Sequence, residues 1–293
     1  IAVMSQVIYP LVHSENSRRY VTITFVVAGG LFMSLHSRFA FGAKFSTLYV
    51  ATTFMLSFLI EWLGSSTGWP FGVYSYNDSL GIRIAGVPLV VPFAWLMMTY
   101  PVFLVARKTM HNWVFIFGGF GLMAWDLFLD PQMVSANRWI WHFNGAAIPL
   151  EKGIPLSNAF GWIFSGMILM AILHKALPKE RRKKEVRTWH VDIFLIWTLF
   201  SGVVGNVFFF HEPGVALIGG IFFGIHYTLL NTILAILIII LMLIAITSLG
   251  LTIGAVMESP EGFGLISSFV IFPLFFLSGA LFPVDKLPAW LHA

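Results

Sequence analysis

Two short polar clusters interrupt long apolar runs, and both contain carboxylates. Residues 125–131 read WDLFLDP and place Asp126 and Asp130 four positions apart, which puts both side chains on one face of a helix. Residues 61–76 read EWLGSSTGWPFGVYSY and begin with Glu61 at the end of another apolar run. Because an acid within a membrane segment is costly, it usually has a partner or a function. We interpret the two clusters as parts of one site.

The residue types in these clusters predict acid catalysis. A carboxylic acid in surroundings of low dielectric constant stays protonated near neutral pH, because desolvation raises its pKa. Two neighbouring carboxylates reinforce this effect, since like charges resist joint ionisation. We therefore expect Asp126 to donate a proton and Asp130 to keep it protonated. Glu61 could hold water or stabilise a cation, and we expect it to position the water. The alternative for Asp130 is an interfacial ion pair with Arg138.

The composition is that of a multi-span membrane protein. Hydrophobic residues occupy 58% of the 293 positions and charged residues only 10%, with a mean hydropathy of +0.86. At about 20 residues per span, we expect an all-α polytopic helical bundle of about eight or nine transmembrane helices. Cysteine is absent, which excludes disulfides and thiolate metal sites. The chain begins at Ile1 and ends at Ala293, and we expect it to be a fragment or an assembled fusion.

Charge distribution predicts the orientation in the membrane. Six expected helices precede residue 211, at 20–41, 46–63, 86–106, 112–130, 156–177 and 190–210. The basic run 179–187 lies between the last two, so the positive-inside rule places it in the cytoplasm. We interpret this run as a topology signal and expect no nucleic-acid partner. The acids then gather toward the non-cytoplasmic side.

Two long loops, 64–86 and 131–155, carry further candidate residues. We expect both loops to fold over a cavity that opens to the lipid. Tyr74 and Tyr76 could orient water or face a cation with their rings. The alternative for them, and for the tryptophans at 69, 139 and 141, is anchoring at the membrane interface. Near residue 156, either Ser157 or Asn158 is expected to cap a helix.

Several motifs, taken in order, resemble one membrane family. They are E-x-x-G-x-x-T-G-x-x-F-G-x-Y-x-Y at 61–76, VP at 87–88, WDxxxDP at 125–131, WIW at 139–141 and GIPxxNxxGW at 153–162. Over about residues 15–225 the chain resembles the carotenoid hydratase family, which includes the bisanhydrobacterioruberin hydratases of haloarchaea. The resemblance implies catalytic roles for Asp126, Asp130 and Glu61. It implies substrate-binding roles for these residues: Tyr74, Tyr76, Trp125, Trp141 and Asn158.

The last part of the chain resembles a different family. The segments TSLGLTIG at 247–254 and FPLFFLSGALFP at 272–283 are similar to the permease subunits of drug- or polysaccharide-exporting ABC transporters. We therefore expect a hydratase-like membrane domain over residues 1–228 and a permease-like fragment over 229–293. The chain has no G-x-x-x-x-G-K-[ST] phosphate loop, so an exporter of this type would need a separate ATPase.

The sequence thus leads to two hypotheses of different classes. The first is a multi-pass enzyme of a prokaryotic plasma membrane, which uses neither cofactor nor metal and adds water to the terminal double bond of an acyclic or monocyclic carotenoid. The second is the transmembrane subunit of an ABC-type exporter. A retinal protein would need a lysine within a span, and a di-iron hydroxylase would need clustered histidines. The lysines lie at span ends or in loops, and the nine histidines are scattered.

Overall fold

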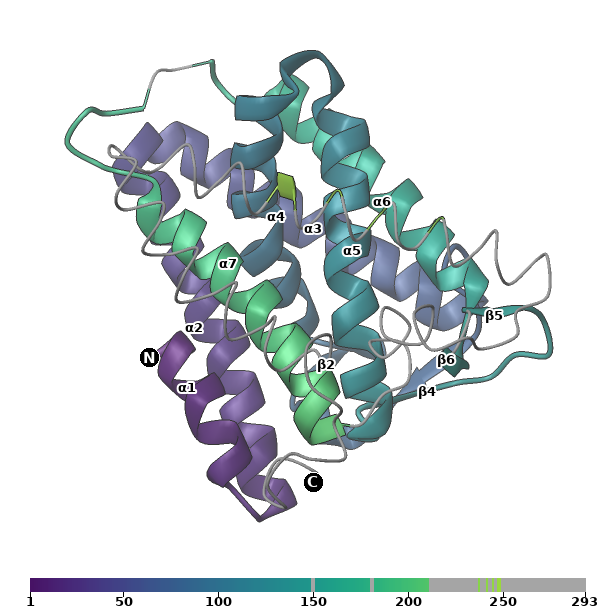
Figure 1. Cartoon of the computed structure of the whole chain (residues 1–293). Coiled ribbons are helices and arrows are strands. Elements are labelled where there is room, and N and C mark those ends of the chain that lie inside the picture. Colours follow the sequence, from purple (N-terminus) through teal and green to yellow (C-terminus); the bar gives the residue numbers. More distant parts are fainter. Residues whose placement is uncertain are drawn as a thin grey trace, which may run out of the picture. The chain divides into compact units, whose positions relative to one another are not determined.

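The computed structural model describes residues 1–148, 151–179 and 182–210, and five isolated helical positions at 237, 241, 244, 247 and 248. The chain divides into two compact units, residues 1–215 and 216–293. The elements described below belong to the first unit (Figure 1). Its helices are α1 (Ala2–Ile8), η1 (Tyr9–Leu11), α2 (Glu15–Phe41), α3 (Ala43–Thr67), η2 (Asp78–Leu80), α4 (Val90–Thr109), η3 (His111–Trp113), α5 (Val114–Ser135), α6 (Leu156–Ala176), α7 (Trp189–Val204) and the π-helical η4 (Gly205–Phe210). Its strands are β1 (Tyr74–Tyr76), β2 (Arg83–Ile84), β3 (Val87–Pro88), β4 (Trp139–Trp141), β5 (Ala147–Ile148) and β6 (Glu151–Pro155).

Five helices of the described residues are long and apolar enough to cross a membrane. They are α2, α3, α4, α6 and the continuous segment His111–Ser135 that contains α5. The prediction of a helical membrane bundle is therefore confirmed. The expected helix at 190–210 is present as α7 followed by η4. The remaining spans of the predicted eight or nine fall on residues outside the described part of the chain.

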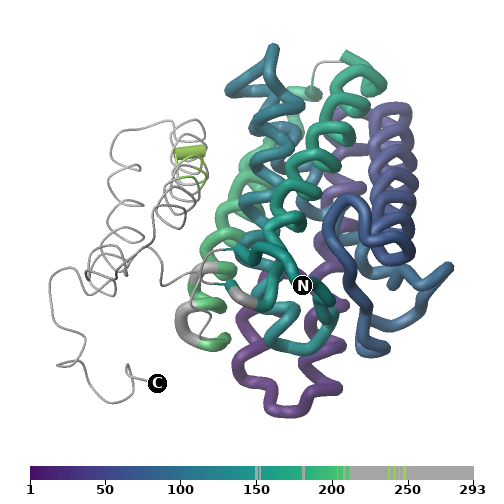
Figure 2. The backbone as a smooth tube through the Cα atoms, turned by 90° about the vertical axis from the view of Figure 1, so that its right-hand side faces the viewer, coloured from purple at the N-terminus to yellow at the C-terminus, as the bar shows by residue number. Residues whose placement is uncertain are grey.

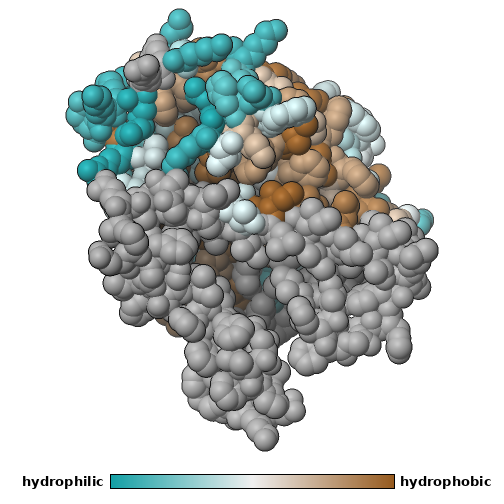
Figure 3. Space-filling model, turned by 45° about the horizontal axis from the view of Figure 1, so that its top comes forward, coloured by the Kyte–Doolittle hydropathy of each residue, from teal (hydrophilic) through white to brown (hydrophobic). Residues whose placement is uncertain are grey.

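The polar and apolar parts of the first unit are separated along the bundle. The strands lie at the end of the bundle opposite to the α6–α7 connection, which contains the basic run (Figure 1). In the coloured part of Figure 3, hydrophilic side chains gather at the upper left and hydrophobic ones lie to their right. Many exposed side chains on the helices are large and apolar, including Leu35, Phe39, Met55 and Phe164, as expected for surfaces in contact with lipid.

Helices α5 and α6 lie side by side (Figure 2), because small residues line their contact. A Cβ atom on Gly166 would lie 2.9 Å from the Cα atom of Gly119. Such close approach of backbones is typical of small residues at helix interfaces in membranes. It brings the first turn of α6 within reach of the acids on α5.

The two loops that carry the candidate residues meet in a short ladder. Strands β1 and β4 pair in antiparallel register, with Tyr74 opposite Trp141 and Tyr76 opposite Trp139. Two further hairpins, β2–β3 and β5–β6, complete the strands of the described chain. The ladder joins residues that are far apart in sequence, and it fixes the two loops at one end of the bundle.

The predicted end of the helix 112–130 is wrong, because α5 continues through Pro131 to Ser135. Proline lacks the N–H group that would bond to the carbonyl four residues earlier. The next turn nevertheless closes, with backbone bonds from Ala136 to the Gln132 carbonyl and from Arg138 to the Met133 carbonyl. Asp130 therefore lies inside the helix rather than at its last position.

We expect Gly161→Ala to destabilise the bundle, because this position of α6 contacts the loop that leads to β1. An added Cβ atom would lie 2.8 Å from the Pro70 carbonyl oxygen and 3.0 Å from the Phe71 Cα atom. Backbone atoms cannot yield by rotation, so the cost should lie in the upper part of the overpacking range of about 1–3 kcal/mol. The measurement is the thermal unfolding temperature in detergent. Gly145→Ala is the control, since no atom of a described residue lies within 4 Å of its Cβ position.

Candidate active site

One amide group joins the two aspartates of α5. The Nδ2 atom of Asn158 donates hydrogen bonds to Asp126 Oδ2 and to Asp130 Oδ2, both at 2.7 Å. All three side chains are at most 2% exposed. The helical spacing places both acids on one face of α5, and the packing of α6 adds the donor that they share. The structure therefore contains the predicted acid pair as a buried, hydrogen-bonded unit.

Two indoles from β4 hold the second oxygen of Asp130. Trp139 Nε1 donates to Asp130 Oδ1 at 2.5 Å, and Trp141 Nε1 donates to the same oxygen at 3.1 Å. The alternative of an ion pair between Asp130 and Arg138 is wrong, since the guanidinium contacts Glu15 at 3.5 Å. These tryptophans thus do more than anchor the protein at the interface.

The prediction that Ser157 or Asn158 caps α6 is also wrong. The N-cap residue is Pro155, which makes no side-chain capping bond. Ser157 Oγ donates instead to the Phe71 carbonyl oxygen at 2.7 Å, and the Asn158 amide bonds the acid pair. Both side chains bond to neighbouring elements of the bundle rather than to their own helix.

Glu61 accepts three hydrogen bonds near the end of α3. Tyr74 and Tyr76 donate to Oε2 at 2.8 and 2.6 Å, and Trp95 Nε1 donates to Oε1 at 3.0 Å. Both tyrosines are therefore bound to the predicted site. Sequence reasoning missed Trp95, because an indole within an apolar helix gives no sign of what it contacts.

The two phenols remain protonated donors. Burial raises the pKa of Tyr74 and of Tyr76 well above the usual value, and the nearby carboxylate of Glu61 raises both further. A phenolate beside a carboxylate would bring two negative charges together at low dielectric constant. The bonds from the tyrosines to Glu61 therefore persist through the physiological pH range.

The β1–β4 ladder connects the two acidic groups. Tyr74, which donates to Glu61, faces Trp141, which donates to Asp130, with ring centroids 5.0 Å apart. Tyr76 and Trp139 form the second such pair at 6.1 Å. Each cross-strand pair thus holds one residue of each acidic group. The geometry supports the interpretation that the two sequence clusters form one site.

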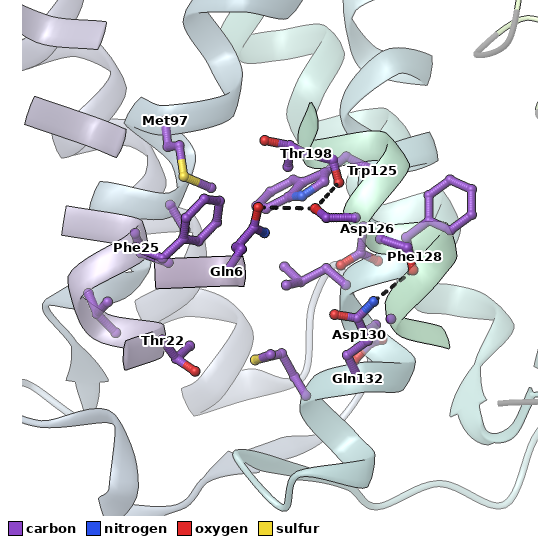
Figure 4. A pocket seen from close by; sticks show the side chains of 18 of the residues that line it. Gln6, Thr22, Phe25, Met97, Trp125, Asp126, Phe128, Asp130, Gln132 and Thr198 are labelled. Atoms are coloured by element: carbon purple, nitrogen blue, oxygen red, sulfur yellow. Dashed lines mark hydrogen bonds between the residues drawn. The ribbon is translucent and has the colours of Figure 1, made fainter. Parts of the chain in front are cut away.

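These groups line a cavity of about 310 Å³. Glu61, Asp126, Asp130 and Asn158 share its wall with many apolar side chains. Trp125, a predicted substrate-binding residue, is 4% exposed and lines the cavity next to the acids (Figure 4). A second group of aromatic rings lies beside the acids. Trp95 stacks on Trp162 with ring centroids 4.5 Å apart, and Trp125 lies edge-on to Trp162 with ring centroids 5.8 Å apart. The arrangement can place a buried acid against an apolar, electron-rich ligand.

Comparison with protein families gives two matches along the chain. A family model described as "Carotenoid biosynthesis protein" matches residues 21–226. A model described as "ABC-2 type transporter" matches residues 198–293. The first match contains Glu61, Asp126, Asp130 and the tyrosines and tryptophans that bond to them.

Individual curated proteins are also similar to the chain. The chain is 26% identical over 192 residues to a bisanhydrobacterioruberin hydratase of Haloarcula japonica, covering 62% of this chain and 61% of that protein. It is 33% identical over 134 residues to nodulation protein J of Rhizobium leguminosarum bv. trifolii, covering 44% of this chain and 51% of that protein. The chain thus spans about half to three fifths of these relatives. No solved structure matches.

Proposed function

The chain belongs to the family of carotenoid biosynthesis proteins, and we propose that it adds water to the terminal carbon–carbon double bond of an acyclic or monocyclic carotenoid. The observation that carries this proposal is the buried pair Asp126 and Asp130, joined by the Asn158 amide in the wall of an apolar cavity. An isolated double bond reacts with water only after a strong enough acid protonates it. A carotenoid is a hydrocarbon polyene, so an apolar cavity suits it.

The proposed reaction has two steps. The Asp126 carboxyl transfers its proton to one carbon, the π bond opens, and a tertiary cation forms at the other carbon. Water then forms the new C–O bond and gives one of its protons to a carboxylate of the site, which restores the acid. Atoms and charge balance without a cofactor or a metal.

Glu61 and the aromatic rings have supporting roles in this scheme. Three donors occupy the Glu61 oxygens, which is how an ionised carboxylate is held in a buried site. Of the two roles expected for Glu61, this arrangement favours stabilisation of the cation over the holding of water. The rings of Trp125 and Trp141, which line the same cavity, would add cation–π attraction.

The substrate enters from the bilayer in this proposal. A long polyene is nearly insoluble in water, and the cavity of about 310 Å³ lies at the lower end of the range of about 300–1,000 Å³ found for small-molecule pockets. The cavity would therefore take one end of the carotenoid, while the rest of the polyene lies between helices or in lipid. Modification of a terminal double bond fits this geometry.

The direct test is expression of the whole chain in a bacterial host that makes lycopene. We expect a carotenoid heavier by one water molecule, detected by chromatography and mass spectrometry. An unchanged pigment profile, with folded protein shown to be in the membrane, would contradict the proposed activity.

We expect Asp130→Asn to lower stability and to remove only part of the activity. Asp130 accepts from two indoles at one oxygen and from the Asn158 amide at the other, whereas an asparagine has only one acceptor oxygen. One donor then faces an N–H group, which should cost about 1–3 kcal/mol of unfolding free energy. The proton donor Asp126 remains, so hydration should fall only about 10- to 100-fold, less than the full effect of an acid catalyst. The measurements are unfolding in detergent and product yield at matched expression.

A second candidate function rests on the match of residues 198–293 to the ABC-2 type transporter family. We propose that the part from about residue 229 derives from an exporter permease, with the division of the chain at 228/229. If it acts as one, the chain should co-purify with a nucleotide-binding ATPase and support nucleotide-dependent export. If neither an ATPase nor nucleotide-dependent export is found, and the host makes hydroxylated carotenoid, the exporter function is contradicted and the hydratase activity is supported.

A further inference from the structure

The cavity has a second polar group on the wall formed by α1 and α7. Its members are the cavity-lining residues Ser5, Gln6, Thr198 and Ser201. None of them carries a charge. Gln6 and Thr198 face the same cavity as Asp126 and Asp130 (Figure 4). The reaction mechanism above does not use this group.

The hydrogen bonds within this group leave one donor free. Ser201 Oγ lies 3.1 Å from two acceptors, Gln6 Oε1 and the Thr198 carbonyl oxygen, and its single proton can go to either. Thr198 Oγ donates to the Phe194 carbonyl oxygen at 2.8 Å. Within the described part of the chain, the amide nitrogen of Gln6 has no hydrogen-bond partner. The group therefore offers an N–H donor from Gln6 and an acceptor oxygen from Ser201. This pattern complements a neutral O–H group, which both accepts and donates.

We propose that Gln6 and Ser201 bind the water molecule that captures the cation, an inference that rests on the proposed hydration. Most of the cavity wall is apolar, and a buried water needs two to four polar partners. The carboxylate of Glu61 already accepts three hydrogen bonds, and so does that of Asp130. Among the described residues, the Gln6 amide nitrogen and the Ser201 hydroxyl oxygen are not occupied by donors in this way. They line the same cavity as Asp126.

The step assigned to this group is the second of the reaction. The bound water donates a lone pair to the tertiary cation, a C–O bond forms, and one O–H bond breaks as its proton returns to a carboxylate of the site. If no water is held there, the cation instead loses a proton from a neighbouring carbon. The double bond is then restored, either in place or shifted by one position. Protonation without hydration is therefore the signature of a lost water site.

The test compares Gln6→Met and Ser201→Ala with the unmodified chain in the lycopene-producing host, using membranes incubated in D₂O. Both variants should lower the hydroxylated fraction about tenfold, the scale of one lost hydrogen bond. Deuterium should still enter recovered or isomerised carotenoid, because the acid remains. Gln132→Met is the matched control: Gln132 also lines the cavity, but its amide nitrogen bonds the Gly202 carbonyl oxygen at 3.0 Å. It should keep the ratio of hydroxylated to isomerised product.

Three outcomes would decide against the assignment. If both variants are folded and give the same ratio of hydroxylated to isomerised carotenoid as the unmodified chain, the water site is overturned and the hydratase proposal stands. A loss confined to a carotenoid that already bears one hydroxyl group means that the cluster binds a substrate hydroxyl instead. A loss of deuterium incorporation equal to the loss of hydration means that the variants damage the acid or the fold. Failure of the unmodified chain to hydrate any carotenoid contradicts the proposed function itself.

Discussion

Asp126→Asn should abolish hydration while the protein stays folded. Asp126 accepts a hydrogen bond at Oδ2 from Asn158, and an asparagine can keep that bond through its own carbonyl oxygen. What it loses is the transferable proton. General acid catalysis commonly contributes about 10²–10⁴-fold. Because an isolated double bond has no other route to the cation, we expect a loss at the upper end of this range or beyond it.

The measurement is hydroxycarotenoid yield at matched expression, together with the unfolding temperature in detergent. Asp78→Asn serves as the control, since this acid lies in η2, outside helix α5, and its side chain is fully exposed and pairs with Arg83 at 3.0 Å. It should hydrate like the unmodified chain. A fully active Asp126→Asn would exclude the proposed acid and with it the mechanism.

The same substitution separates protonation from water capture. Asp126→Asn should also remove deuterium incorporation from D₂O, because no cation forms. Gln6→Met should retain that incorporation and lose only hydration. The two variants thus report on successive steps, and a common phenotype would contradict the division of roles between the two walls of the cavity.

The acid pair could be predicted from sequence because it depends on one helix. A spacing of four residues fixes Asp126 and Asp130 on one face wherever the helix packs. The apolar runs likewise predicted α2 to α6 to within a few residues. The exception was Pro131, whose missing N–H did not end α5 because the following turn closes its own bonds.

The partners of the acids could not be predicted, because they depend on tertiary contacts. Asn158 reaches α5 only because Gly119 and Gly166 let the two helices approach closely. Its position near the start of α6 suggested a capping role, which is a local explanation for a residue that acts across an interface. Trp95 lies within an apolar run and gave no signal. Register between β1 and β4 decides that Trp141 faces Tyr74, and no local pattern specifies that pairing.

Glu61→Gln should slow hydration about 10²- to 10³-fold, the cost of removing one electrostatic stabiliser of a transition state. The side chain should remain in place. The indole of Trp95 can only donate, so the glutamine should keep its oxygen toward Trp95 and turn its amide nitrogen toward Tyr74 and Tyr76. Phenolic hydroxyls can rotate to accept. The fold therefore survives, and the site loses its negative charge.

The product distribution of Glu61→Gln distinguishes the two roles considered for this residue. If Glu61 stabilises the cation, every product formed through the cation should fall together, and the ratio of hydroxylated to isomerised carotenoid should match that of the unmodified chain. If Glu61 holds the water, isomerised product should rise at the expense of hydroxylated product. We expect the first result, because Tyr74, Tyr76 and Trp95 already occupy the carboxylate. A rise in isomerised product with Glu61→Gln, and none with Gln6→Met, would move the water from the α1–α7 wall to Glu61.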